Sequence, residues 1–219
     1  MIFADQCYHV LNRANRRAEI FHDAADYTAF IRLMARAQAR IEVPILAACL
    51  MPNHIHLVVR PRKNGDVSSW MHWLFTTHVR HYHEKYATSG RLWQGPFKAF
   101  IVQTDHYLLT LLRYVERNAQ RANLVERAEH WAWGSLRWRV SDRSPLPLTP
   151  SPVALPGYWL DLVNQPQTAA EIDAIRRCVN RQLPFGDPEW VEHQQRHDDL
   201  LNPRTGADRV RARRPVPKR

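Results

Sequence analysis

The feature that most constrains the fold is a pair of apolar runs that only two residues separate. Residues 43–51 ("VPILAACLM") and 54–60 ("HIHLVVR") have the length and composition that are typical of strands, and Pro52 and Asn53 stand between them. Parallel strands need a crossover of about a dozen residues or more, so this short connection makes the pair antiparallel. The rest of the chain must therefore be arranged around an antiparallel hairpin.

Further strands and helices on both sides of the hairpin complete an order of elements that points to one fold. The sequence pattern predicts two more strands and three helices, the third of which Asp105 can cap. The strands are expected at 8–13 and 97–103, and the helices at 24–41, 66–86 and 106–124. The order β-α-β-β-α-β-α is the split βαβ plan of ferredoxin-like folds. We therefore predict an α+β fold in which a four-stranded antiparallel sheet carries the first two helices on one face.

The C-terminal third of the chain differs in composition from the rest. Residues 141–157 contain five prolines and predict an extended linker or a wrap on the surface. Beyond them the sequence predicts one helix at 168–182 and a short one at 185–195. The predicted organisation is a main domain at 1–140, a linker at 141–157, a helical extension at 158–203 and a basic tail at 204–219.

The charge of the chain favours a polyanionic partner, but it is unevenly distributed. The net charge is +10 and the pI is about 10.1, which is typical of proteins that bind nucleic acid. The tail at 204–219 carries seven basic residues and one acid, a net charge of +6, so residues 1–203 carry only +4. The body is mildly basic, and charge alone supports no more than weak nucleic-acid affinity.

Several classes of protein are disfavoured by what the sequence lacks. No apolar run approaches the roughly twenty residues of a membrane-spanning helix, and the N-terminus shows no pattern of a signal peptide. Cys7, Cys49 and Cys178 are too few and too widely spaced for a disulfide framework or a zinc knuckle. We expect a protein of a reducing cytoplasm with no membrane partner.

Two histidines in the second strand of the hairpin form a candidate metal site. Alternate side chains of a strand share a face, so His54 and His56 point the same way, about 7 Å apart along the strand. Both rings can converge on one divalent ion, and the alternative is that they face solvent or bond to neighbours. Because two ligands hold Mg²⁺ or Mn²⁺ poorly, the metal hypothesis requires a third protein group.

The third expected helix supplies a candidate ligand and a candidate nucleophile. Tyr114 and Asn118 are four residues apart and share one helix face. A phenol with a pKa of about 10 is a weak nucleophile, but a metal that neutralises a nearby phosphate makes attack on phosphorus feasible. The alternative is that Tyr114 lies at the rim of the core with its hydroxyl in water and that Asn118 is an ordinary polar helix residue.

Another tyrosine competes with Tyr114 for the role of nucleophile. Tyr82 lies in "HVRHYHEK", among His78, His81 and His83. His81 and His83 are two residues apart on a helix and face different ways, which disfavours a metal site there. We interpret this cluster as a helix surface that faces solvent or phosphate. The residues alone do not choose between the two tyrosines.

Five blocks of the sequence occur in the order and spacing of a known family. The blocks are "CYHVLNRANRR", "CLMPNHIHLVVRP", "GRLWQGPFKAF", "DHYLLTLLRYVERNAQRANLV" and "WAWGSL". They resemble the REP-associated tyrosine transposases, which are similar to the single-tyrosine transposases of the HUH endonuclease superfamily. The resemblance covers about residues 6–140 and continues more weakly through "VNRQLPFGDPEWVE".

This resemblance implies a function and assigns roles to the candidate residues. It implies that His54 and His56 bind Mg²⁺ or Mn²⁺, that Tyr114 is the nucleophile and that Asn118 is the third ligand. The implied activity is DNA nicking and joining by transesterification through a 5′-phosphotyrosine, which needs no nucleotide cofactor. The implied substrate is single-stranded DNA beside a REP-type hairpin, in association with a bacterial nucleoid.

Candidate DNA-binding residues lie in two loops. Arginine and lysine side chains can hold phosphates, and an indole can either stack on an unpaired base or pack in the core. For Trp93 both possibilities stay open. Pro96 stands where the family often has an arginine. The candidates are Arg13, Asn15, Arg16 and Arg17 in the first loop, and Arg91, Trp93, Gln94 and Lys98 in the second.

Two other functions are compatible with a fold of this class. One is a domesticated relative that binds DNA repeats without cutting them, which the presence of the complete His54, His56, Tyr114 and Asn118 set disfavours. The other is a ferredoxin-like RNA-binding module, which would present aromatic residues on its central strands, where this chain has histidines. The oligomeric state, monomer or helix-swapped dimer, stays open.

Overall fold

Four strands pair as a single antiparallel sheet, as the hairpin predicted. In this computed structural model, which describes residues 2–141 and 144–201, the strands lie in the order β2-β3-β1-β4. They are β1 (Cys7–Arg13), β2 (Ile45–Met51), β3 (His54–Val59) and β4 (Lys98–Val102). The two longest ladders join β3 to β1 and to β2, so the strand that carries His54 and His56 lies inside the sheet.

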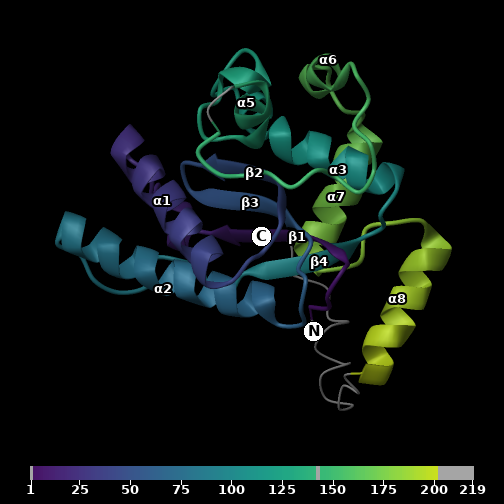
Figure 1. The fold of residues 1–219 in the computed structure, drawn as a ribbon, viewed down its shortest axis with the longest axis horizontal. Helices are drawn as coiled ribbons and strands as arrows, with labels where there is room; N and C mark the ends of the chain where they lie inside the picture. The colour runs from purple at the N-terminus through teal and green to yellow at the C-terminus, as the bar shows by residue number, and fades with distance from the viewer. Residues whose placement is uncertain (1, 142–143, 202–219) are drawn as a thin grey trace, which may run out of the picture.

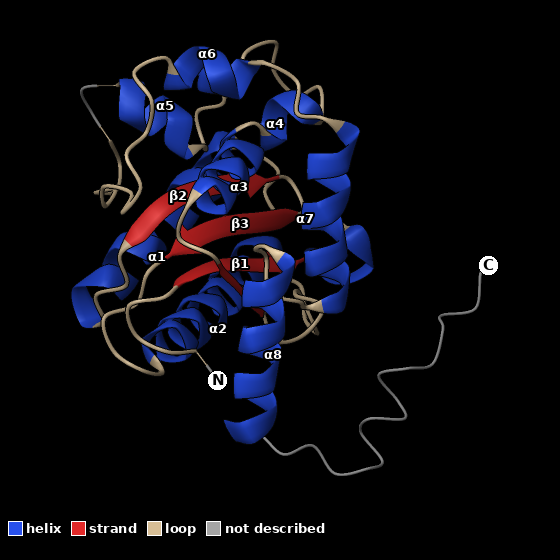
Figure 2. Ribbon diagram, turned by 90° about the vertical axis from the view of Figure 1, so that its right-hand side faces the viewer, coloured by secondary structure: helices blue, strands red, loops and turns tan. Residues whose placement is uncertain are grey.

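Helices cover both faces of the sheet (Figures 1 and 2). The first face carries α1 (Ala24–Arg40) and α2 (Asp66–Tyr86), and the second carries α3 (His106–Glu116), so the predicted ferredoxin-like arrangement is confirmed. The other elements are η1 (Asn15–Arg17), α4 (Asn118–Arg121), η2 (Ala128–His130), α5 (Ser135–Val140), α6 (Trp159–Asn164), α7 (Ala169–Arg181) and α8 (Pro188–Leu201).

Strand alternation divides the core into two layers. On β3, Ile55 and Leu57 pack under α1 and α2, whereas Val58 packs with Leu111 and Leu112 of α3 on the other face. Because each strand contributes to both layers, β2 is buried along its whole length. The histidines of β3 therefore lie on the α3 side, beneath the predicted nucleophile helix.

The predicted third helix differs from the observed one in its continuity and length. It is interrupted at Arg117 and ends at Arg121, rather than running to Leu124. Arg117 keeps φ −84° and ψ −1°, and its N–H still bonds to the carbonyl of Arg113, so the interruption does not redirect the chain. Asp105 caps the start of α3 through the N–H of Tyr107, as predicted.

The C-terminal part contains helices that the sequence did not reveal. The short elements η2, α5 and α6 were not predicted, because a helix of a few residues shows too little periodicity, and α8 is longer than the expected 185–195. Part of the proline-rich segment lies against the sheet, with Leu146 buried and the N–H of Thr149 bonded to the carbonyl of Ile45. The predicted basic tail at 204–219 lies outside the described residues.

A buried carboxylate fastens these helices to α3. Glu116 accepts hydrogen bonds of 2.7 Å from Ser135 Oγ, Arg139 Nε and Trp159 Nε1. A buried charge is tolerated only when it is paired and hydrogen-bonded, and Glu116 meets both conditions. The last residue of α3 is thereby tied to α5 and α6.

Candidate active site

The structure places the two histidines of β3 on the face that α3 covers. Their ring centroids are 4.9 Å apart, His56 is only 4% exposed and His54 is partly exposed. Arg13 of β1 is the cross-strand neighbour of His54. The rings therefore form a partly buried pair with a basic side chain beside it.

Each of these imidazoles has its Nδ1 atom engaged by a neighbour. His56 Nδ1 lies 2.8 Å from Nε2 of His9, a buried residue of β1, and His54 Nδ1 lies 2.6 Å from Oδ1 of Asn53. Within residues 2–141 and 144–201, neither Nε2 atom of His54 or His56 has a hydrogen-bond partner. Metal-binding histidines commonly present one nitrogen to the ion while a neighbour holds the other. The pair has this arrangement.

Burial keeps both imidazoles uncharged at neutral pH. It lowers the pKa of His54 to about 4, with help from the positive charges of Arg13 and Arg121. The pKa of His56 is also well below its ordinary value, chiefly because of burial and then because of its histidine neighbours. Since a metal binds the neutral form, the site is prepared for a cation without first losing protons.

Tyr114 lies next to the histidines and Tyr82 does not. The ring centroid of Tyr114 is 6.0 Å from that of His56 and 6.5 Å from that of His9. Tyr82 is on α2, across the sheet, where its hydroxyl lies 2.9 Å from His22 Nε2. The structure thus brings Tyr114, and not Tyr82, beside the histidines of β3.

Asn118 follows Tyr114 by one helical turn and is 3% exposed. Its Nδ2 atom is buried and has no hydrogen-bond partner among the described residues, which leaves the amide free to turn towards a ligand. Among the described residues, no group of three His, Cys, Asp or Glu side chains is placed to hold a metal. The predicted set is of a different kind, because its third member is the amide of Asn118. The available donors are two neutral imidazole nitrogens and one amide, a set that fits a divalent cation completed by substrate oxygens.

His9 is a part of the site that the sequence analysis missed. In the sequence, the only signal at His9 was the alternation of apolar and polar residues in "YHVLNR", which is typical of a strand. The pairing of β1 with β3 brings it diagonally across to His56, and its own Nδ1 is buried with no partner in residues 2–141 and 144–201. Nothing local to either strand predicts this contact.

The two predicted DNA-binding loops lie side by side. The N–H of Asn15 bonds to the carbonyl of Leu92 at 2.7 Å, and the N–H of Gln94 bonds to the carbonyl of Arg13 at 2.9 Å. The first loop begins at Arg13, the cross-strand neighbour of His54. Arg13 is half-buried. The predicted residues of these two loops and the adjoining start of β4 that have exposed side chains are Asn15, Arg16, Arg17, Arg91, Gln94 and Lys98.

Two expectations for aromatic residues need correction. Trp93 is 6% exposed and packs against Phe75 and Phe30, so its ring is not available to stack on a base and the packing alternative applies. His78 does not belong to a solvent-facing cluster, because it is buried beside Phe30 and Trp93, whereas His81 is exposed. Both rings fill the layer under α1 and α2.

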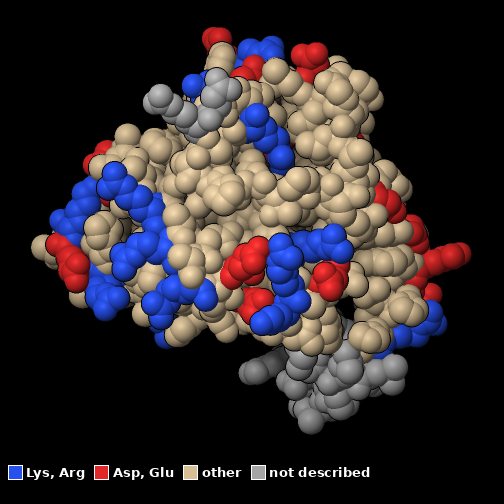
Figure 3. All heavy atoms as spheres, in the orientation of Figure 1, with Lys and Arg blue, Asp and Glu red and all other residues tan. Residues whose placement is uncertain are grey.

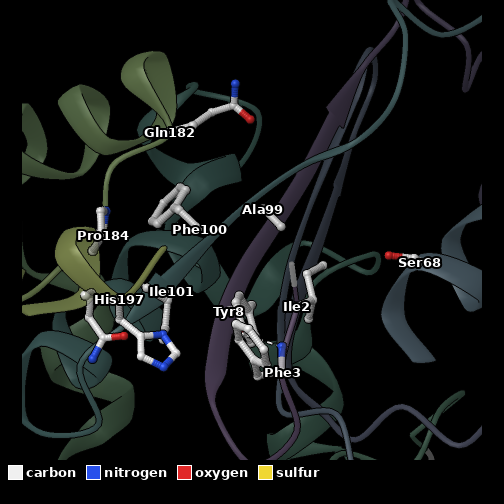
Figure 4. Close-up of a pocket in the computed structure, with 11 residues that line it drawn as sticks. Ile2, Phe3, Tyr8, Ser68, Ala99, Phe100, Ile101, Gln182, Pro184 and His197 are labelled. Carbon is white, nitrogen blue, oxygen red and sulfur yellow. Dashed lines mark hydrogen bonds between the residues drawn. The ribbon is translucent and has the colours of Figure 1, made fainter. Parts of the chain in front are cut away.

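Two other features of the described surface lie apart from the predicted site residues. A cavity of about 220 Å³ lies between β4, the N-terminal segment and α8, and no predicted site residue lines it (Figure 4). Lys and Arg side chains gather over the end formed by α1 and α2 (Figure 3), where Arg36 and Arg40 stack on Trp73. None of the described helices is long and apolar enough to span a membrane.

Comparisons with known proteins identify a family for this chain and agree with its fold. Residues 3–118 match the family described as "Transposase IS200 like", a span that contains His54, His56, Tyr114 and Asn118. No curated protein matches the chain. A solved structure of a REP-associated tyrosine transposase bound to a REP hairpin is similar, with a TM-score of 0.55 and 15% identity over 67% of this chain and 86% of that one.

A second solved structure is less similar. It is a putative transposase from Deinococcus radiodurans R1, with a TM-score of 0.38 and 17% identity over 50% of this chain and 88% of that one, too distant to support an argument. At 15% identity the first neighbour establishes the fold. The family match covers more than half of the chain and confirms the family expected from the sequence blocks. The chain therefore belongs to the IS200-like transposase family.

Proposed function

We propose that this protein is a metal-dependent tyrosine transposase that nicks and rejoins single-stranded DNA beside a hairpin. The observation that carries the proposal is the contact between Tyr114 and His56, whose ring centroids are 6.0 Å apart across the α3–sheet interface. A nucleophile next to a neutral histidine pair is the constellation that phosphoryl transfer to a tyrosine requires. Its occurrence in a transposase family makes DNA the substrate.

The proposed roles of the residues follow from their positions. His54, His56 and Asn118 would hold Mg²⁺ or Mn²⁺, which when bound polarises a phosphate and neutralises charge on its oxygens. Tyr114 Oη attacks phosphorus, the bond from phosphorus to the 3′ oxygen breaks, and the proton given up by the phenol is balanced by the proton that the 3′ oxygen gains. The products are a 5′-phosphotyrosine and a free 3′-OH. Attack by another 3′-OH reverses the step, so no nucleotide is consumed.

The proposed substrate is DNA with a folded repeat. The adjoining loops that contain Arg13 and Arg91 would carry the phosphate contacts, and Arg13 lies opposite His54 in the neighbouring strand. The solved neighbour is bound to a REP hairpin, which supports a hairpin with a single-stranded flank as the ligand. Such a substrate would be met on the chromosome of a bacterium, so the proposed location of the activity is the cytoplasm near the nucleoid.

Adduct formation tests the proposal. A hairpin oligonucleotide with a labelled single-stranded flank and Mn²⁺ should give a protein–DNA adduct that withstands SDS. Tyr114→Phe should abolish the adduct and leave hairpin binding within about twofold, since only the nucleophilic oxygen is removed. Tyr82→Phe is the matched control and should keep the wild-type yield.

Other outcomes would change the assignment. An adduct that persists in Tyr114→Phe would move the nucleophile to another tyrosine, and wild-type cleavage by His56→Ala would remove the proposed metal site. Tight hairpin binding without cleavage under any metal would favour the non-catalytic DNA-binding alternative.

A further inference from the structure

The helix face that carries Tyr114 also carries two arginines that have no acidic partner in the part of the chain that the structure describes. Arg117 and Arg121 follow Tyr114 at i+3 and i+7, positions that lie on one side of a helix. The hydrogen bond from the N–H of Arg121 to the carbonyl of Arg117, 2.9 Å long, continues the helical path beyond the interruption. The nucleophile and both guanidinium groups are therefore presented together.

Arg121 is in direct contact with the nucleophile. Its Cζ atom lies 3.9 Å from the centroid of the Tyr114 ring, so the guanidinium stacks on the phenol. A guanidinium carries five N–H donors in a planar fork that matches the oxygens of a phosphate. The stack holds this fork beside the ring whose oxygen would be bonded to phosphorus.

These two arginines have unsatisfied donors inside the protein. Arg121 Nη1 and Arg117 Nε are both buried without a hydrogen-bond partner, and within residues 2–141 and 144–201 neither side chain lies within 4.0 Å of a carboxylate. Buried charged donors are costly when unpaired. An anion from outside the chain would remove that cost.

Two nearby arginines differ from Arg117 and Arg121 because they have hydrogen-bond partners. Arg113, on the same helix, donates to the carbonyls of Leu162, Gln165 and Pro166, and Arg139 donates to Glu116. Arg113 and Arg139 are thus paired where they hold helices together, whereas Arg117 and Arg121 beside Tyr114 have no carboxylate partner among the described residues.

We propose that Arg117 and Arg121 form a phosphate-binding site that holds the DNA phosphate while Tyr114 attacks it. Arg121 donates to the non-bridging oxygens of the scissile phosphate, and Arg117 adds a second positive charge on the same side. Both contacts remain in the phosphotyrosine, because the non-bridging oxygens take no part in bond exchange. The inference rests on the proposed function for the identity of the attacked phosphate.

A neutral phosphate analogue tests the inference in the cleavage reaction. We would compare wild type, Arg121→Ala and Arg121→Lys on a hairpin oligonucleotide and on the same oligonucleotide with a methylphosphonate at the mapped cleavage position. At saturating DNA, Arg121→Ala should slow adduct formation by about 10²–10³-fold on the phosphodiester, the usual effect of losing one charge-stabilising donor. On the methylphosphonate, which has lost the charge, the deficit should fall below about tenfold. Lysine should restore part of the rate.

Two results would overturn the inference in this assay. One is a wild-type rate for Arg121→Ala, and the other is an equal deficit on both substrates, which would indicate a structural role. Arg176→Ala, which removes one exposed charge from α7, is the charge-matched control and should leave the rate unchanged. Arg121→Gln, which keeps most of the side chain, replaces the alanine variant if that variant melts early.

A binding measurement decides the inference even if no cleavage is found. In a Tyr114→Phe background, affinity for a single-stranded oligonucleotide is measured between 50 and 200 mM salt. Each lost phosphate contact should lower the slope of log affinity against log salt by about 0.7. If Arg121→Ala has a reduced slope and the wild type shows no cleavage, the phosphate-binding site is supported and the proposed function is refuted. An unchanged slope would overturn the phosphate site, whether or not the wild type cleaves.

Discussion

His9 offers a sharp test of how the proposed metal site is held. If His56 donates from Nδ1 to His9 Nε2 at 2.8 Å, its Nε2 lone pair is free for a metal. If His9 donates instead, the proton of His56 lies on Nε2 and blocks the ligand position. His9→Leu removes the acceptor and leaves the buried Nδ1 of His56 facing an apolar side chain. The variant should therefore favour the blocked tautomer.

The magnitude follows from the contact that is lost. A buried neutral hydrogen bond contributes about 1 kcal/mol, and leaving its donor unsatisfied adds about 1–3 kcal/mol. Loss of a partner that orients a metal ligand weakens metal affinity by about 10–100-fold, or about 1.4–2.8 kcal/mol, which agrees with that range. We expect His9→Leu to bind Mn²⁺ about 10–100-fold more weakly than wild type.

Calorimetric titration of Mn²⁺ into the DNA-free protein at pH 7.5 measures this effect. His9→Gln, whose amide can accept at a similar reach, should recover part of the affinity. Asn53→Ala, which removes the corresponding partner of His54, should weaken binding in the same way. Wild-type affinity in His9→Leu, with an unchanged unfolding temperature, would refute the reasoning.

Two further predictions concern stability. Burial lowers the pKa of His78 to about 3, so between about pH 6.5 and 3 the unfolded chain binds a proton that the folded protein does not, and the free energy of unfolding falls as the pH falls. Urea unfolding should give a lower free energy of unfolding at pH 5.0 than at pH 7.5. This loss should be up to about 2 kcal/mol smaller in His78→Phe than in wild type, and an equal loss in both proteins would contradict this cause. Glu116→Gln leaves Arg139 without its buried carboxylate and should lower the free energy of unfolding by about 3–5 kcal/mol, measured by urea unfolding. A loss below about 1 kcal/mol would contradict the role of Glu116 in fastening the helices to α3.

Local periodicity predicted much of the fold and half of the candidate site. The two-residue connection at Pro52 and Asn53 made the hairpin antiparallel, and alternation placed His54 and His56 on one face, as observed. Helical spacing placed Tyr114 and Asn118 one turn apart. These features depend on backbone geometry within a few residues, which is why a single sequence reveals them.

Tertiary structure decided which separate segments meet. The register of β1 against β3 brings His9 to His56 across 47 residues, and the packing of α3 rather than α2 on the histidine face brings Tyr114, and not Tyr82, beside the histidines. The same packing buried Trp93 beneath α1 and α2. Register and the choice of sheet face are set by the sum of many long-range contacts, and no short segment contains that information. The sequence alone therefore determined which side chains share one face of a strand or helix. The tertiary structure determined which helix packs on each face of the sheet.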